Sequence, residues 1–260
     1  MTLNAPIQWF PGHMAKAMRK LGERLALADV VIEVGDARVP AASLNPYLDK
    51  LLGDRLRLLV LGREDLADPA ATRRWVAWYT AQGRQTVAVD GRSQPGVNRA
   101  RAALKELLRD RGPSRAIVVG IPNTGKSALI NGLVRRTVAR TENKAGVTRQ
   151  LQWFRMNPGL EVMDTPGILV PKISTTEAQW MLALTGALPR ARYDPEEVSA
   201  HFAAWAAVHA PRLKVPDLET FARSRGSSDL HNAAGAYVKA FNEGAFGHIT
   251  LEFPPDGEAP

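Results

Sequence analysis

The chain contains no cysteine, and this absence removes three kinds of chemistry. A protein without thiols has no disulfide scaffold, no cysteine-based zinc site and no thiol nucleophile. Long apolar runs are missing too, since none approaches the roughly 20 residues with which a helix crosses a bilayer. Residues 1–10 lack the basic stretch and apolar core of a secretory signal. We therefore expect a cytoplasmic protein that has no membrane partner.

The remaining composition is that of a folded protein with an excess of positive charge. Hydrophobic residues make up 45% of the 260 positions and charged residues 23%, which excludes an intrinsically disordered chain. Lysine and arginine number 34 against 26 aspartate and glutamate, so the formal net charge is +8. A positive excess of this size favours a polyanionic partner, because the counterions that a polyanion releases drive association. The class of polyanion has to come from the motifs.

The first two-thirds of the chain alternates short β-branched runs with helical patterns. Such alternation predicts βαβ units and a doubly wound, mostly parallel sheet, the α/β fold of P-loop proteins. The expected strands are 29–35, 57–62, 86–89 and 115–120, and the expected helices between them are 45–52, 69–82 and 97–109. A basic amphipathic helix is expected at 14–28, and a hairpin at 151–156 and 160–163.

The pattern changes after Pro171, beyond which only helices are predicted. They cover 177–188, 195–208, 218–223 and 231–243. We therefore expect two domains: an α/β domain at 1–172 and a smaller all-helical domain at 173–260.

A phosphate-binding motif lies between a predicted strand and a predicted helix. Gly120–Ser127 reads G-I-P-N-T-G-K-S and fits the P-loop pattern G-x-x-x-x-G-K-S/T without a mismatch. The backbone N–H groups of such a loop and the helix N-terminus bind phosphate oxygens. Lys126 is expected to reach the β- and γ-phosphates, and the Ser127 hydroxyl to bind Mg²⁺. The predicted nucleotide contacts of this loop are Asn123, Thr124, Gly125, Lys126, Ser127 and Ala128.

A second motif, Asp164-Thr165-Pro166-Gly167, follows the strand predicted at 160–163. An aspartate at this position holds Mg²⁺, and the Gly167 N–H senses a γ-phosphate. The polar loop 135–149 lies between the two motifs, and its Thr148 is the candidate switch threonine that closes on Mg²⁺. The predicted metal ligands are therefore Ser127, Thr148 and Asp164, and Lys126 and Thr148 are predicted to serve catalysis.

The order of these motifs is unusual. An ordinary small GTPase begins with the P-loop and carries its base-reading loop on later strands. Here the P-loop starts at residue 120, and everything after Gly167 is predicted to be helical. The missing strands must precede the P-loop, so the motif order predicts a circular permutation.

The permutation places the base-reading loop after the strand at 57–62. In the position of a guanine-reading N-K-x-D stands Gly62-Arg63-Glu64-Asp65. Asp65 is able to accept hydrogen bonds from guanine, and Arg63 to cover the base with its stem or planar head. Gly62, however, offers no side-chain amide, and the next loop, Asp90–Ser93, lacks the usual Ser-Ala pattern. The sequence thus predicts nucleotide binding and leaves guanine selectivity open.

Six segments together resemble a known family. They are I-Q-W-F-P-G-H-M-A-K-A at 7–17, D-A-R-V-P at 36–40, the P-loop, K-A-G-V-T at 144–148, D-T-P-G at 164–167 and G-H-I-T-L-E at 247–252. With them the chain resembles, over nearly its whole length, the circularly permuted ribosome-assembly GTPases of the YlqF/RbgA type. The first segment is far more specific than any P-loop. The departure from the family pattern is Gly62–Asp65.

The resemblance implies a GTPase that binds GTP and GDP, with Mg²⁺ as cofactor and K⁺ as a second cation held by Asn123. It implies that the GTP form binds the immature large ribosomal subunit, both rRNA and ribosomal proteins, and leaves after hydrolysis. Ile168 stands where ordinary small GTPases carry a water-orienting glutamine, and the resemblance points to His13 as its replacement. The alternative for His13 is a turn residue or an RNA contact. We expect the free protein to be a monomer.

Two functions from different classes follow. The first is a large-subunit assembly GTPase with a low intrinsic rate that the ribosome stimulates. The second is a nucleotide-binding RNA or ribosome-binding factor with negligible hydrolysis or relaxed base specificity. Gly62 and Ile168 motivate the second function, and a ribosome-stimulated hydrolysis assay separates it from the first.

Overall fold

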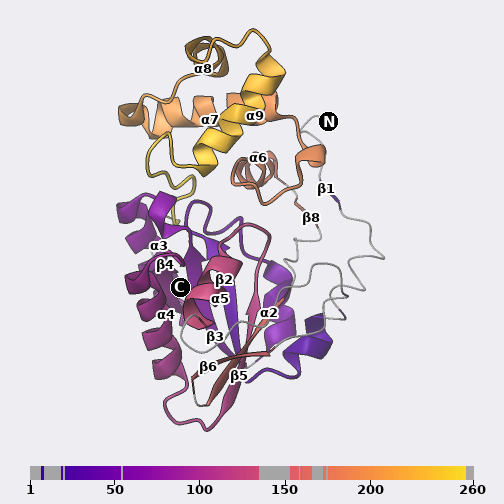
Figure 1. Ribbon diagram of the computed structural model, residues 1–260, viewed down its shortest axis with the longest axis vertical. Helices are drawn as coiled ribbons and strands as arrows, with labels where there is room; N and C mark the ends of the chain where they lie inside the picture. The colour runs from indigo at the N-terminus through magenta and orange to yellow at the C-terminus, as the bar shows by residue number, and fades with distance from the viewer. Residues whose placement is uncertain are drawn as a thin grey trace.

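The structure is a computed structural model that describes residues 7–8, 19, 21–53, 55–134, 153–157, 159–165, 172–173 and 175–255. Figure 1 shows a sheet with helices around it and a separate group of helices at one end. We call residues 21–165 the α/β region and residues 175–255 the helical region. Four residues singled out from the sequence, His13, Thr148, Gly167 and Ile168, lie outside the described residues.

The sheet has six strands in the order β4-β3-β2-β5-β7-β6. Their bounds are β2 Val30–Asp36, β3 Leu56–Gly62, β4 Gln85–Val89, β5 Ser114–Val119, β6 Trp153–Asn157 and β7 Leu160–Asp164. All neighbouring strands are parallel except the β6–β7 hairpin. The chain builds β2, β3 and β4 outward on one side and then resumes with β5 on the other side of β2. The predicted fold class and its permuted order are confirmed, and the P-loop follows β5 at the point where the strand order reverses.

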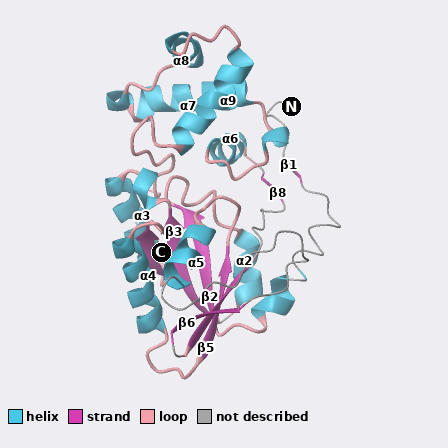
Figure 2. Cartoon of the chain, viewed as in Figure 1, coloured by secondary structure: helices cyan, strands magenta, loops and turns pink. Residues whose placement is uncertain are grey.

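Helices cover both faces of the sheet (Figure 2). Residues 21–25, α2 (Pro46–Leu52) and α3 (Pro69–Ala81) pack on one face, and α4 (Gln94–Leu107) and α5 (Lys126–Val134) on the other. Because both faces are covered, β2 is buried along its whole length. This is why the central strands read as continuous apolar runs in the sequence.

The helical region consists of α6 (Thr176–Leu184), α7 (Pro195–His209), α8 (Leu218–Ser224) and α9 (Leu230–Asn242), with short 3-10 turns at Arg190–Arg192 and Pro211–Leu213. An aromatic cluster forms its centre, in which Phe202 lies 5.0 Å from Phe241 and Phe221 lies 4.9 Å from Tyr237 between ring centroids. None of the helices that the structure describes is long and apolar enough to cross a membrane.

Three helix ends and two strands differ from the sequence prediction. The helix predicted at 14–28 ends at Leu25, and residues 26–28 lie outside it. The predicted helix 177–188 is wrong at its end, because Gly186 adopts a left-handed φ of 77° that stops α6 at Leu184. The helix predicted from residue 97 begins at Gln94, because the Ser93 side chain accepts the Gly96 N–H at 3.1 Å and caps it. The sequence also missed β1 (Ile7–Gln8) and β8 (Lys172–Ile173), which pair antiparallel with each other. The domain boundary at 172/173 stays a prediction.

The end of the helical region returns to the α/β region. The N–H of Ile249 donates to the carbonyl of Leu66 at 3.0 Å, and the N–H of Leu251 donates to the carbonyl of Arg38 at 2.7 Å. From the other side, Ile121 of the P-loop is buried in the same apolar cluster as the helices. The nucleotide loops are therefore in contact with the helical region.

Candidate functional site

The carboxyl ends of four parallel strands bring four loops to one edge of the sheet. These loops follow β2, β3, β4 and β5 and begin at Ala37, Arg63, Asp90 and Gly120. In open α/β sheets, ligands bind in the crevice at this edge, next to the strand-order reversal. The P-loop, the loop of Asp65 and the loop of Asp90 therefore share one side of the molecule, as the permuted order predicts.

The P-loop is pressed against the central strand β2. Gly120 has a φ of 150°, and a Cβ at this position would lie 2.2 Å from the carbonyl oxygen of Val34. Only glycine fits such an approach. The loop then enters α5 at Lys126, so its backbone N–H groups and the helix N-terminus face the same space.

Lys126 is a buried cation, with 7% of its surface exposed. Its Nζ donates to the carbonyl of Ile121 at 2.6 Å within the loop. Burial lowers the pKa of Lys126 to about 8, and the carboxylate of Asp164 opposes this shift. The ammonium group is thus held at the loop with much of its hydration removed, which strengthens its attraction to a phosphate.

Ser127 and Asp164 are the two predicted magnesium ligands that lie among the described residues. Ser127 is exposed in the first turn of α5, and Asp164 is exposed at the end of β7, opposite Val118 of β5. Val118, the partner of Asp164, lies two residues before Gly120, so Asp164 stands at the strand end beside the P-loop. A hydroxyl and a carboxylate are the oxygen ligands that Mg²⁺ prefers.

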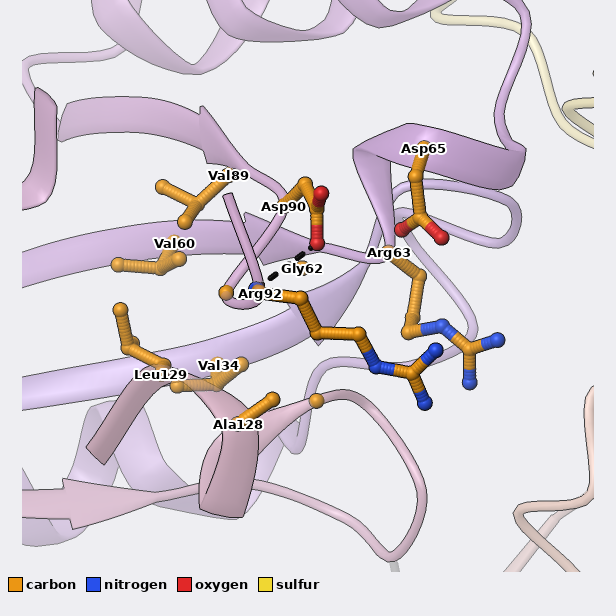
Figure 3. A pocket seen from close by; sticks show the side chains of 12 residues that line it. Val34, Val60, Gly62, Arg63, Asp65, Val89, Asp90, Arg92, Ala128 and Leu129 are labelled. Atoms are coloured by element: carbon orange, nitrogen blue, oxygen red, sulfur yellow. Dashed lines mark hydrogen bonds between the residues drawn. The ribbon is translucent and has the colours of Figure 1, made fainter. Parts of the chain in front are cut away.

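A pocket lies beside the P-loop between the ends of β3 and β4 (Figure 3). Its volume is about 60 Å³, against the ~10–15 Å³ that holds one water molecule. Its lining residues include Val34, Val60, Arg63, Asp65, Val89, Asp90, Arg92 and Leu129. The apolar side chains on one side and the half-buried carboxylate of Asp65 on the other form a lining that suits a flat base with N–H donors.

Two arginines border this pocket. Arg63 has a left-handed backbone, with φ 58°, and its stem lies against Gly125 of the P-loop. Arg92 extends to the same side, and its N–H donates to Asp90 Oδ1 at 2.9 Å (Figure 3). Sequence reasoning missed Arg92. Its position could have indicated a role, because Arg92 lies in the loop after β4, and β4 is the neighbour of the strand β3 that precedes Asp65.

The missing asparagine of the base-reading motif has a structural explanation. A Cβ on Gly62 would lie 2.1 Å from the carbonyl oxygen of Thr124. The P-loop thus occupies the space into which a side chain at position 62 would point. In this arrangement no asparagine amide fits between the P-loop and β3.

The most deeply buried charge of the described residues is Arg38, which the sequence marked only as part of D-A-R-V-P. Its guanidinium bonds Asp36 with two nitrogens, at 2.9 and 2.7 Å, and both side chains are almost fully buried. It also donates to Asn242 Oδ1 at 3.0 Å and to the carbonyl of Thr185 at 3.3 Å. This ion pair at the end of β2 therefore bonds directly to the helical region.

Asn123 makes a second such connection. This exposed P-loop residue has a left-handed φ of 64°, and its amide nitrogen donates to the carbonyl of Gly186. Four of the predicted nucleotide contacts lie together on the P-loop and the start of α5, namely Asn123, Thr124, Lys126 and Ser127. Asp164 lies at the end of β7, and Asp65 lies just beyond the end of β3. Their roles stay predictions, as do those of His13, Thr148 and Gly167.

Fold and site together define a class: a P-loop nucleotide-binding protein with circularly permuted motifs. The chain is 34% identical to Ribosome biogenesis GTPase A of Bacillus cereus, over 96% of this chain and 95% of that protein. It belongs to the Ribosome biogenesis GTPase A family. The protein of that name from Thermotoga maritima is 30% identical over the same shares of both chains.

Two further comparisons agree. A family model described as "50S ribosome-binding GTPase" matches residues 115–192. The crystal structure of GNP-bound YlqF from T. maritima has a TM-score of 0.72 and 28% identity, over 93% of this chain and 99% of that chain. The GDP-bound structure of the same protein has a TM-score of 0.71 and 28% identity, over 92% and 100%.

Proposed function

We propose that this protein is a GTP-hydrolysing assembly factor of the large ribosomal subunit. The observation that carries the proposal is the phosphate loop with buried Lys126 at the strand-order reversal, beside a pocket that contains Asp65. Relatives named for ribosome biogenesis and a family model for 50S binding support the ribosomal role. The GNP and GDP bound to the similar YlqF structures support a guanine nucleotide.

In this proposal the nucleotide lies along the carboxyl edge of the sheet. The phosphates contact the loop from Asn123 to Ala128, the base enters the pocket with Asp65, and the Gly167 N–H senses the γ-phosphate. Ser127, Thr148 and Asp164 would hold Mg²⁺, which neutralises charge on the β- and γ-phosphates when it is bound. K⁺ is proposed to be held by Asn123, whose amide supplies a carbonyl-type oxygen.

Hydrolysis is the attack of water on the γ-phosphorus, with cleavage of its bond to the bridging oxygen. Lys126 attracts the phosphates, and Thr148 would supply a hydroxyl ligand to Mg²⁺. His13 is proposed to orient the water, because Ile168 has no group that does so. We expect a low intrinsic rate that the ribosome raises when it orders these groups. A hydrolysis assay with and without large subunits, repeated with His13→Ala, tests this step.

The ribosomal partner agrees with the charge of the chain. A net charge of +8 favours rRNA, since phosphate neutralisation releases counterions. The helical region is the proposed rRNA contact, with ribosomal proteins as further partners. A cytoplasmic location, the absence of a membrane partner and a monomeric free state are part of the same proposal.

Replacing Asp65 with alanine tests base recognition. We expect the affinity for GDP to fall about 10- to 100-fold, because a hydrogen bond to a charged group contributes about 1.5–3 kcal/mol and 1.4 kcal/mol is tenfold. The affinity for ADP should not change. Titration of labelled GDP and ADP in the presence of Mg²⁺ measures both.

The matched control is Glu64→Ala, which removes the neighbouring carboxylate. Glu64 pairs with Arg99 at the surface and does not line the pocket. It should leave both affinities unchanged. Equal and weak binding of GDP and ADP by the unaltered protein would contradict guanine selectivity.

That outcome would favour the second candidate function, a ribosome-binding factor with relaxed base choice. The observation behind it is the contact between Gly62 and Thr124, which excludes the usual asparagine. Hydrolysis that large subunits fail to stimulate would favour its other form, a factor with negligible hydrolysis.

The lowered pKa of Lys126 predicts a pH dependence of nucleotide binding. A phosphate stabilises the charged ammonium, so the pKa in the complex lies above the value of about 8 in the free protein. Between these two values, binding takes up a proton. The dissociation constant for GDP should therefore rise with pH above about 8, by up to about tenfold per pH unit. Calorimetry in buffers of different ionisation enthalpy measures the proton uptake directly.

Lys126→Arg is the control for this pH effect. Its guanidinium stays charged across the whole range, so the slope should disappear whatever the absolute affinity. A slope that survives in Lys126→Arg would assign the effect to another group.

A further inference from the structure

Two helices of the helical region end against the nucleotide loops. The carbonyls of Thr185 and Gly186, just beyond α6, accept from Arg38 and from Asn123 of the P-loop. The carbonyl of Asn242, the last residue of α9, accepts from Arg63 Nη2 at 3.2 Å. The last carbonyls of a helix have no partner within the helix and form its negative end, so they attract guanidinium groups.

Asn242 is the residue that connects these contacts. Its Oδ1 accepts from the buried Arg38 at 3.0 Å, and its Nδ2 donates to the carbonyl of Leu184 at 2.7 Å. The first contact fixes α9 to the ion pair at the end of β2, and the second fixes it to the end of α6. Both bonds hold the end of α9, which carries the main-chain carbonyl of Asn242, against its neighbours.

That carbonyl holds the guanidinium of Arg63 beside the base pocket. Burial lowers the pKa of Arg63, and so does the nearby Arg38, while the carboxylates of Asp36 and Asp65 oppose this shift. A guanidinium that is partly desolvated and faces a like charge needs acceptors to stay in place. Arg63 stands in the lysine position of the guanine-reading N-K-x-D pattern, and its stem lies against Gly125.

We propose that Asn242 is a positioning residue for base recognition: it holds Arg63 over the base and so couples nucleotide binding to the helical region. This inference rests on the proposed function, because it assumes that the pocket with Asp65 takes the base. Gly62 offers no amide to position the loop. In our proposal, the hydrogen bond from Arg63 to the carbonyl of Asn242 replaces that amide. The affinity for a ligand that has phosphates but no base should not depend on Asn242.

The test is a double-mutant cycle with Asn242→Ala and Arg63→Ala, measured with two ligands in the presence of Mg²⁺. GDP contacts both the P-loop and the base pocket, whereas inorganic tripolyphosphate contacts the P-loop alone. We expect Asn242→Ala to weaken GDP binding about tenfold and to leave tripolyphosphate binding unchanged. In the Arg63→Ala background the same substitution should have no further effect on GDP.

Two additional variants separate positioning from loss of stability. Tyr237→Phe removes a hydrogen bond to the carbonyl of Pro216 inside the helical region, away from the contact. It should lower the melting temperature without changing GDP affinity. If Asn242→Ala fails to fold, Asn242→Ser also removes the amide that bonds Arg38 and the carbonyl of Leu184, and it supplies the same comparison.

Three results would overturn the inference. They are an equal loss for GDP and tripolyphosphate, a full effect of Asn242→Ala in the absence of Arg63, and no effect on GDP at all. In each case, GDP binding by the unaltered protein that Asp65→Ala weakens as expected would show that the proposed function stands and only the coupling fails. If the unaltered protein binds no guanine nucleotide, both fail together.

Discussion

Replacing Lys126 with methionine is expected to weaken GTP binding by at least about 10- to 100-fold, because a hydrogen bond to a charged group contributes about 1.5–3 kcal/mol and 1.4 kcal/mol is tenfold. The same substitution should make the folded protein more stable. The weaker binding and the higher stability have one cause: Lys126 is a buried cation, and its phosphate partner is present only when the nucleotide is bound. Function and stability therefore move in opposite directions at this position.

The sign of the stability effect follows from the pKa. The value for Lys126 falls from 10.5 to about 8 on folding, so below about pH 8 the folded protein carries the full cost of a desolvated charge. As the pH rises from about 8 to 10.5, the unfolded chain binds the extra proton and this cost disappears. Methionine has a similar length and no charge. After the loss of the hydrogen bond to Ile121, a gain on the order of 1–3 kcal/mol remains at neutral pH.

Urea unfolding of both proteins, at neutral pH and above the pKa of 10.5, measures this difference. The advantage of Lys126→Met should shrink at the higher pH, and nucleotide titration gives the loss of binding. Ser127→Ala is a useful comparison, because it alters the same loop without removing a buried charge. A variant that binds GTP normally, or one that is less stable than the parent at neutral pH, would contradict this account of Lys126.

The sequence alone was sufficient for the sheet, the permutation and the P-loop. Buried parallel strands leave continuous apolar runs, as in residues 58–61, and the phosphate motif lies within eight consecutive residues. Both signals are local. The order of the motifs then determined the topology, because the remaining strands of a GTPase sheet had to lie before the P-loop in the sequence.

What the sequence did not show depends on contacts between distant residues. Arg38 and Asn242 are separated by 204 positions, and neither belongs to a nucleotide-binding motif. The early end of α6 depends on the backbone of Gly186, and the exclusion of a side chain at Gly62 depends on where the P-loop lies. Charge pattern gives no indication that one arginine among many is fully buried.

Arg38→Met is expected to destabilise the protein by about 3–5 kcal/mol, the cost of removing one partner from a buried ion pair. Asp36 would remain buried without its cation, and the contacts to Asn242 and Thr185 would be lost. The guanidinium also lies 5.4 Å from the ring of Phe241, a further contact across the two regions. The loss should therefore extend to the attachment of the helical region.

Arg38→Lys should be only a partial rescue, because an ammonium group cannot bond both carboxylate oxygens of Asp36 and reach Asn242 as well. Arg109→Ala is the matched control: it breaks an exposed pair with Glu106, and such pairs contribute less than about 1 kcal/mol. Urea unfolding measures stability, and limited proteolysis near residues 175–185 measures detachment. If Arg38→Met unfolds at the same urea concentration as Arg109→Ala, the ion pair does not join the two regions, and the positioning of Arg63 by Asn242 loses its anchor.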